Sequence, residues 1–360
     1  MNGNIDLFEL GLNGEFLEEY NGKYAGLHLG RVAQEHKNIY KVITQKGELV
    51  ARVSGKMLFD AEGREDYPAV GDWVVLDKED DDGGDPVIHG ILTRKSKFSR
   101  KAAGRTAEEQ IVATNIDNIF ICMALNDNYN LRRLERYVSL AWESGAVPVV
   151  LLTKADLCGD LEARLSEVQC AAIGIDVVAI SVVDMRGTGE IGKYIGKGRT
   201  VAFLGSSGVG KSTLINMLLG EHKQSTQETG SHDKGRHTTT YRELLVCPSG
   251  GILIDTPGMR ELQLLDSEEG INNSFSDIAE LARMCRFSDC KHNGEPGCAV
   301  RRAIEEGTLT EERYGSYRKL LREAEFMERK INAAARQSYK KMIIQRGKEI
   351  RNSPVHARKK

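Results

Sequence analysis

A glycine-rich segment that ends in a lysine and two hydroxyl residues is the part of this sequence best suited to bind an anion. Residues 205–213 read Gly-Ser-Ser-Gly-Val-Gly-Lys-Ser-Thr, between apolar runs at 201–204 and 214–219. A strand, a loop of this composition and a helix, in that order, are typical of a phosphate-binding P-loop. Glycines let backbone N–H groups point at the anion, and the helix N-terminus adds the positive end of its dipole. The alternative is a glycine-serine turn that precedes a lysine by chance, and the flanking strand and helix disfavour it.

The residues of this loop have expected roles in holding a nucleotide. Lys211 is expected to reach the β- and γ-phosphates, and the hydroxyl of Ser212 to coordinate magnesium (Mg²⁺). The predicted nucleotide-binding residues of the loop are Gly205, Ser206, Ser207, Gly208, Val209, Gly210, Lys211, Ser212 and Thr213.

A second motif indicates which base is bound. Thr153-Lys154-Ala155-Asp156 follows an apolar run at 147–152, which places it at the carboxyl end of a strand, where ligands bind in open α/β sheets. In GTPases the aspartate of such a motif accepts the N1–H and the exocyclic amine of guanine, a donor pair that adenine does not present. Ser181 ends the next strand, where GTPases carry an S-A-x loop behind the base; here valine replaces the alanine, so the match is loose. The predicted nucleotide-binding residues of these two segments are Thr153, Lys154, Ala155, Asp156 and Ser181.

Two further segments predict contacts near the γ-phosphate. Residues 251–255 read as a strand that leads into D-T-P-G, from Asp255 to Gly258. Asp255 is expected to hold Mg²⁺ through a water, and the Gly258 N–H to contact the γ-phosphate. The polar segment 230–240 has the position of switch I, with Thr238 and Thr239 as the two candidates for its threonine.

These motifs occur in a permuted order. An ordinary Ras-like GTPase has its P-loop first, whereas here the base-reading motif precedes the P-loop. The sequence therefore predicts a circularly permuted GTPase domain that starts near Ile116, ends near Leu265 and binds GTP and GDP. Whatever follows residue 265 is joined directly to the γ-phosphate-sensing segment, an arrangement suited to coupling nucleotide state to a C-terminal module.

The residues expected to activate water are unusual. Ras-like enzymes carry a glutamine just after D-x-x-G, but this position holds Met259, which cannot orient a water molecule. A slow intrinsic rate of hydrolysis is expected unless another side chain substitutes. His237, a polar residue on the segment assigned to switch I, is the candidate catalytic residue. A solvent-exposed loop histidine without a catalytic role is the alternative.

Three cysteines and a histidine have the spacing of a metal site. Cys285, Cys290, His292 and Cys298 lie within fourteen residues, with glycines and a proline between them that allow tight turns. Three thiolates and one imidazole form a closed tetrahedral zinc (Zn²⁺) site of the structural type, with no position open for a substrate. Disulfides are the alternative, and they are rare in the cytosol. The other four cysteines, Cys122, Cys158, Cys170 and Cys247, occur singly and are expected to be buried, reduced thiols.

The composition is ordinary for a globular protein, except for one segment that is rich in basic residues. The 360 residues carry a net charge of −2, but residues 311–360 contain 15 lysines and arginines against six acidic residues. This local excess favours contact with RNA, with a solvated helix face as the alternative. The first residues lack the pattern of a secretory signal, and no run of about 18 apolar residues occurs. We expect a cytoplasmic, monomeric protein that does not contact membranes.

The periodicity of the chain predicts three domains. A helix is expected near 7–20, and short strands at 28–34, 39–44, 48–54, 72–76 and 87–92 fit a small barrel, of the OB or the SH3-like type. Buried strands at 118–125, 147–152, 176–181 and 200–204 alternate with helices at 131–144 and 161–173, which predicts a mainly parallel α/β sheet. Helices are expected at 300–306, 311–335 and 337–347. The expected domains are a barrel with a basic linker at 1–105, a GTPase domain at 106–268 and a helical zinc domain at 269–360.

The basic linker at 94–106 has two interpretations. Its lysines and arginines are placed to contact RNA phosphates, or it is a solvated connector.

The combination of a barrel, T-K-x-D before G-S-S-G-V-G-K-S-T, G-R-H-T-T-T, D-T-P-G and C-x₄-C-x-H-x₅-C resembles the bacterial ribosome small-subunit-dependent GTPase A family. The resemblance covers nearly the whole chain. It implies an OB-type barrel, GTP hydrolysis stimulated by the 30S subunit, and a role in late 30S maturation through contacts with 16S rRNA. The family also has a hydrophobic residue directly after D-x-P-G, which Met259 matches here. Its switch I histidine is implicated in catalysis, so the resemblance implies a catalytic role for His237. An RNA-binding regulatory GTPase without ribosome specificity is the alternative function.

Overall fold

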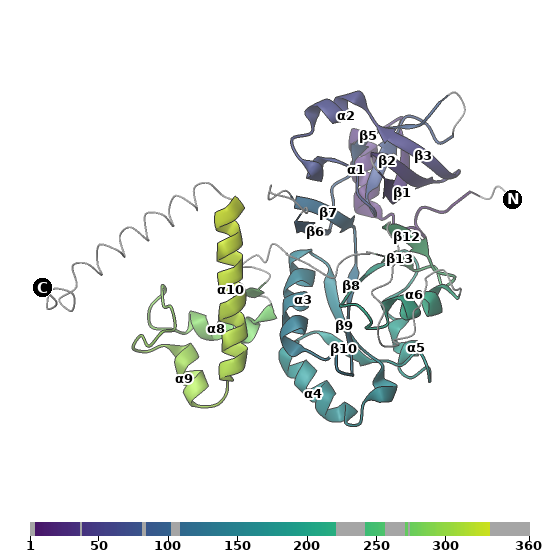
Figure 1. Cartoon of the computed structure of the whole chain (residues 1–360). Coiled ribbons are helices and arrows are strands. Elements are labelled where there is room, and N and C mark those ends of the chain that lie inside the picture. The colour runs from purple at the N-terminus through teal and green to yellow at the C-terminus, as the bar shows by residue number, and fades with distance from the viewer. Residues whose placement is uncertain are drawn as a thin grey trace, which may run out of the picture. The chain divides into compact units, whose positions relative to one another are not determined.

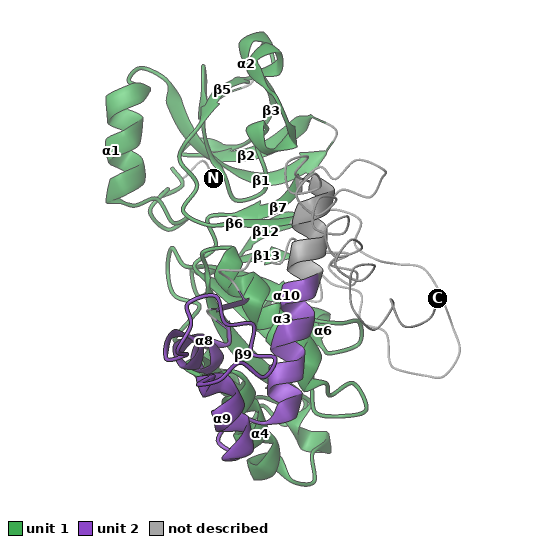
Figure 2. Ribbon diagram, turned by 90° about the vertical axis from the view of Figure 1, so that its left-hand side faces the viewer, with its two compact units in different colours: residues 1–102, 108–264 green, residues 103–107, 265–360 purple. Residues whose placement is uncertain are grey.

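The computed structural model describes residues 4–36, 38–80, 84–101, 109–220, 242–255, 271–272 and 274–331, and side chains at all of these except 100, 101, 109 and 323–331 (Figure 1). The chain divides into unit 1, residues 1–102 and 108–264, and unit 2, residues 103–107 and 265–360 (Figure 2). The expected sites at His237, Thr238, Thr239 and Gly258, and the expected helix at 337–347, lie outside the described residues.

The described elements follow one another in this order. Unit 1 contains α1 (Gly14–Lys23), β1 (His28–His36), β2 (Ile39–Thr44), β3 (Gly47–Val53), α2 (Gly55–Asp60), η1 (Arg64–Asp66), β4 (Trp73–Leu76), β5 (Val87–Ile91), β6 (Lys97–Lys101), β7 (Glu109–Thr114), β8 (Asn118–Ala124), α3 (Leu131–Glu143), β9 (Val147–Thr153), η2 (Ala155–Leu157), α4 (Leu161–Ala171), β10 (Asp176–Ala179), α5 (Thr188–Ile191), β11 (Thr200–Leu204), α6 (Lys211–Leu219), β12 (Glu243–Val246) and β13 (Ile252–Asp255). Unit 2 contains α8 (Ser276–Arg283), α9 (Ala299–Glu305) and α10 (Glu311–Ile331).

Strands β1 to β5 close into the predicted barrel. They are hydrogen-bonded in the order β1-β2-β3-β5-β4, and an additional pairing of β1 with β4 completes the ring. The β3–β5 pairing is parallel and the others are antiparallel. This five-stranded closed ring is of the OB type, the first of the two barrels considered.

The helix before the barrel begins later than the sequence pattern predicts. The side chain of Asn13 accepts a hydrogen bond from the Phe16 N–H at 3.2 Å and caps α1. A capped terminus fixes the start of a helix, so residues 7–11 form turns instead. Phe16 is buried and its ring lies 6.1 Å from that of Trp73, which packs α1 against the barrel.

The second half of unit 1 is the predicted α/β sheet. Its strands lie in the order β10-β9-β8-β11-β13-β12. The first four pairings are parallel, and only β12 runs antiparallel to β13. β12 was not predicted, because a strand of four residues is too short to show a recognisable pattern.

Alternating side chains of the parallel strands enter two separate cores. Ile119 and Ile121 of β8 belong to a core with α3 and α4, whereas Phe120 and Cys122 belong to one with α5 and α6. The sheet therefore lies between two helical layers, as Figure 1 shows. Strands buried on both faces read as continuous apolar runs, which explains why this part of the sequence was predictable.

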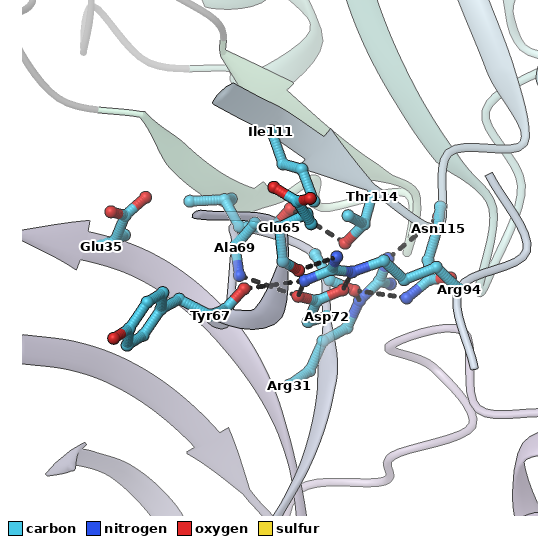
Figure 3. A network of polar contacts seen from close by, with 12 residues as sticks. Arg31, Glu35, Glu65, Tyr67, Ala69, Asp72, Arg94, Ile111, Thr114 and Asn115 are labelled. Atoms are coloured by element: carbon cyan, nitrogen blue, oxygen red, sulfur yellow. Dashed lines mark hydrogen bonds and ion pairs between the residues drawn. The ribbon is translucent and has the colours of Figure 1, made fainter. Parts of the chain in front are cut away.

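A buried polar network joins the barrel to the α/β sheet (Figure 3). Arg31 of β1 is fully buried and donates to the carbonyls of Leu10, Gly71 and Asn115, the last two at 3.2 Å. Asn115 Nδ2 donates to the same Gly71 carbonyl at 3.1 Å. Burial lowers the pKa of Arg31 to about 10. A buried guanidinium is stable only when its donors are satisfied, so these carbonyls fix the junction.

The basic segment after the barrel is structured where it is described. Arg94 forms two hydrogen bonds to the buried carboxylate of Asp72, at 2.9 and 2.7 Å, and it also donates to the carbonyls of Glu65 and Tyr67. Residues 97–101 form β6, which pairs with β7 in an antiparallel hairpin that was not predicted. Arg94 therefore stabilises the barrel, a structural role that neither interpretation of the segment included.

Unit 2 is helical, as predicted, and has its own core. Ile271, Phe275 and Ile278 pack with Val300, Ala303, Leu309, Tyr314, Tyr317 and Leu320. Arg313 of α10 donates to both carboxylate oxygens of Asp277 at 2.8 and 2.9 Å. α8 was not predicted, because half of its eight residues are polar and only Ile278 among the eight is buried.

The prediction for the single cysteines was partly wrong. All seven cysteines are free thiols; Cys122 and Cys247 are buried, Cys158 is half-buried and Cys170 is exposed. Cys170 lies near the end of α4, on a face that points away from the core residues Val168 and Ala171. Within the described residues, no helix combines the length and apolarity that crossing a bilayer requires.

Candidate functional site

The glycine-rich loop lies between a fully buried strand and a helix, as expected. β11 ends at Leu204, and α6 begins at Lys211 after Gly210, which has a φ of +97°. A Cβ atom on Gly205 would lie 2.5 Å from the carbonyl oxygen of Cys122 in β8. Only glycine fits this approach, so the first residue of the loop is fixed against the neighbouring strand.

The side chain of Lys211 is hydrogen-bonded to the backbone of the loop itself. Lys211 Nζ donates to the carbonyls of Gly205 and Ser206, at 2.6 and 2.7 Å. Ser212 is half-buried and Thr213 is exposed, both on the first turn of α6. A cation and a helix N-terminus thus lie together at the loop, an arrangement that attracts polyphosphates.

The T-K-x-D motif lies at the carboxyl end of β9 and contacts the loop directly. Thr153 Oγ1 donates to the Val209 carbonyl at 2.6 Å, and both residues are buried. Lys154 adopts a left-handed conformation, with φ +57°, and this turns the chain into η2. Asp156 is exposed in η2, whereas Ala155 is buried. The motif predicted to read the base and the loop predicted to hold the phosphates are therefore one connected structure.

Ser181 is buried beside this motif and shapes its own loop. Its hydroxyl accepts hydrogen bonds from the N–H groups of Val183 and Asp184, at 3.2 and 3.4 Å. The Ala155 N–H donates to the carbonyl of Ile180 at 3.1 Å, which joins the two predicted base-contacting segments. Val183 is 86% exposed, so the loop presents an apolar side chain to solvent.

Asp255 is the last described residue of β13. The strand runs parallel to β11, with Ala202 opposite Ile254, so Asp255 lies at the same carboxyl edge as the P-loop. Parallel strands bring their carboxyl ends to one edge, where ligands bind. The same edge holds the carboxyl ends of four parallel strands, β8, β9, β11 and β13.

Two contacts at this edge were not predicted. Cys122 lies against Gly205, and Asn128, in the turn after β8, bonds to Ser206 and Ser207. Burial raises the pKa of the Cys122 thiol to about 12, so it is a neutral packing residue. The only sequence signal for either residue was its place at or just after the end of a buried strand, beside the loop.

The predicted metal ligands form a cluster in unit 2. The ligand atoms of Cys285, Cys290, His292 and Cys298 all lie within 4.8 Å of one another. Cys285 Sγ lies 3.9 Å from Cys298 Sγ, and His292 Nδ1 lies 3.5 and 3.3 Å from these two sulfur atoms. A tetrahedral zinc ion places its sulfur and nitrogen ligands roughly 3.6–3.8 Å apart, so the donor set and its spacing fit this ion.

The surroundings favour the metal-binding protonation state at Cys285 and His292, whereas burial and the neighbouring cysteines raise the pKa of the Cys290 thiol to about 11. Burial raises the pKa of the Cys285 thiol, but hydrogen bonds from the N–H groups of Ala299 and Val300 and from the other two cysteines outweigh it and lower the pKa overall. Desolvation lowers the pKa of His292, which keeps its imidazole neutral. Thiolates and neutral imidazole are the forms that bind zinc.

The fold and the chain order define a circularly permuted GTPase. The structure of YloQ, described as a circularly permuted GTPase, has 25% sequence identity and a TM-score of 0.62, and the match covers 84% of this chain and 96% of that one. The structure of YjeQ from Thermotoga maritima has 26% identity and a TM-score of 0.63, over 83% and 98%.

Sequence comparisons narrow this class to one family. Residues 91–265 match the RsgA GTPase family. The chain is 50% identical to the small ribosomal subunit biogenesis GTPase RsgA 2 of Lactiplantibacillus plantarum, over 84% of this chain and 85% of that one. It is 45% identical to RsgA 1 of Oceanobacillus iheyensis, over 89% and 93%. The chain belongs to the RsgA GTPase family, which confirms the resemblance seen in the motifs.

The Thr153 hydroxyl offers a direct test of the connection between the two motifs. Thr153→Val keeps the shape of the side chain but leaves the buried Val209 carbonyl without its donor, at a cost of about 1–3 kcal/mol. We expect a lower free energy of unfolding in urea and several-fold weaker binding of GDP and GTP. Thr153→Ser keeps the hydroxyl and should retain most of both. Equal losses in the two variants would show that the hydrogen bond does not matter.

Proposed function

We propose that this chain binds and hydrolyses GTP and acts in the biogenesis of the small ribosomal subunit. The observation that carries the proposal is the junction of Thr153 with Val209, which joins a T-K-x-D motif to a P-loop at one sheet edge. Membership of the RsgA GTPase family supports the same activity. The names of the relatives, small ribosomal subunit biogenesis GTPases, support the proposed process.

In this proposal, each part of the edge has a role in nucleotide binding. Asp156 accepts the N1–H and exocyclic amine of guanine, the stem of Lys154 covers the ring, and Ser181 holds the loop behind the base. The loop from Gly205 to Thr213 encloses the phosphates, and Lys211 turns from its present carbonyl partners towards the β- and γ-phosphates. Bound Mg²⁺ would neutralise phosphate charge, held by Ser212, by Thr238 or Thr239 and, through water, by Asp255, while Gly258 contacts the γ-phosphate.

Hydrolysis is proposed to be slow without a partner. Met259 occupies the position of the water-orienting glutamine and offers no hydrogen bond. His237 is proposed as the residue that orients the attacking water. The stimulating partner is proposed to be the 30S subunit, contacted through its 16S rRNA, at a late stage of its maturation. The proposed setting is the cytoplasm, with the chain acting as a monomer.

The Cys-His cluster is proposed to hold one structural zinc ion. Its four donors leave no position for a substrate, and a bound ion would supply folding free energy to a segment with few apolar residues of its own. The proposed domains are the barrel and linker at 1–105, the GTPase domain at 106–268 and the zinc-binding helical domain at 269–360. The excess of basic residues at 311–360 supports a contact with RNA.

GTP turnover with purified ribosomal particles tests the function. We expect low turnover for the chain alone and a rise of at least about tenfold with 30S, but not with 50S or 70S particles. His237→Ala should lower the stimulated turnover and leave GTP affinity near that of the wild type. Turnover that no particle changes would exclude the ribosomal function, and stimulation by unrelated RNA would favour a regulatory GTPase without ribosome specificity. Unchanged turnover of the His237 variant would remove its catalytic role.

Metal content tests the cluster. We expect one zinc ion per purified chain, measured by mass spectrometry of the metal, and less than one in Cys298→Ser, because a closed site needs all four donors. Cys170→Ser, which changes an exposed cysteine outside the cluster, should keep its zinc. Both variants should bind GDP as the wild type does. A wild-type chain purified without zinc, or a Cys298 variant with full zinc, would contradict the assignment.

A further inference from the structure

The turn between β8 and α3 reaches across to the P-loop. Asn128 Nδ2 donates to the Ser207 carbonyl at 3.2 Å, and the Ser206 hydroxyl donates to Asn128 Oδ1 at 3.1 Å. Asn128 precedes the two serines by 78 and 79 positions in the sequence, and it meets them because β8 is the direct neighbour of β11. One amide side chain thus binds two consecutive residues of the loop.

Asn128 is itself held in place. Arg133, on the first turns of α3, donates through Nη2 to the Asn128 carbonyl and to Asn128 Oδ1. The Asn126 side chain accepts from the Asn128 N–H at 3.0 Å, and Asn130 caps α3. A side chain whose orientation is fixed by other hydrogen bonds can position its partners with little further loss of entropy.

The two halves of the P-loop are held by different neighbours. Val209 in the second half is fixed by Thr153 of β9. The first half, Ser206 and Ser207, is held by Asn128 and by Lys211, whose ammonium group donates to the Ser206 carbonyl at 2.7 Å. If Lys211 turns to the phosphates, as the proposed function requires, it leaves this carbonyl. Asn128 is uncharged, so phosphates would not attract its side chain away from Ser206 and Ser207.

We propose that Asn128 is a positioning residue for nucleotide binding, which keeps Ser206 and Ser207 in the shape that receives the phosphates when Lys211 moves. Arg133 supports it by fixing the amide. The proposal rests on the proposed GTP-binding function and adds to it a residue outside both the P-loop and the T-K-x-D motif. A loop that is already in its binding shape loses less entropy on binding, so the contribution falls on affinity.

Nucleotide affinity of Asn128→Ala in the full-length chain tests the proposal. We expect GDP and GTP to bind about 3- to 10-fold more weakly, by titration with fluorescent GDP and competition with GTP. Turnover at saturating GTP should stay within about twofold, so that KM changes and kcat does not. Asp127→Ala removes a side chain of similar size from the same turn, and it should bind both nucleotides as the wild type does.

A double-mutant cycle separates positioning from general support of the fold. Ser206→Ala removes the hydroxyl that donates to Asn128, so the losses of affinity in Asn128→Ala and Ser206→Ala should be less than additive. Additive losses, or equal affinities of the Asn128 and Asp127 variants, would overturn the positioning role while the wild type still binds GDP. A wild-type chain that binds neither GDP nor GTP would overturn the proposed function and the inference with it.

Discussion

The hydrogen bond from the Thr153 hydroxyl to the Val209 carbonyl is the interaction on which the proposed nucleotide site depends. It is 2.6 Å long and buried, and it joins the end of β9 to the second half of the P-loop. Gly205 against Cys122 and Ser206 against Asn128 fix the first half from the end of β8. A flexible glycine-rich loop thereby takes its shape from the two strands beside its own, which is possible because parallel strands end at one edge.

The same sheet also connects the other parts of the chain. β12 lies at the edge of the α/β sheet and meets β1 of the barrel, where Gln34 Nε2 donates to Glu243 Oε1 at 2.5 Å. β13 is the last described strand before the chain continues towards unit 2. The buried guanidinium of Arg31 fixes the barrel to the segment that enters β8.

Much of this fold was predictable because it depends on patterns along the chain. The buried strands from 118 to 204, the P-loop and the Cys-His spacing appeared with nearly their observed bounds. The β6–β7 hairpin, β12 and α8 did not, because they are short or polar and are stabilised by partners distant in sequence. Asn128 was not predicted for the same reason, because its proposed role depends on residues about 80 positions away in the sequence. Cys170 was wrongly expected to be buried, because composition does not show which face of a helix a residue occupies.

We propose that Thr153 to Asp156 and the P-loop form one site for guanine nucleotides. The most direct measurement is the dissociation constant of GDP against that of ADP for the intact chain with Mg²⁺, at one salt concentration. Guanine can donate two hydrogen bonds to the Asp156 carboxylate, whereas adenine leaves that carboxylate without donors. The site should therefore bind GDP at least about 100-fold more tightly than ADP. Affinities for GDP and ADP within about tenfold of each other would contradict the account.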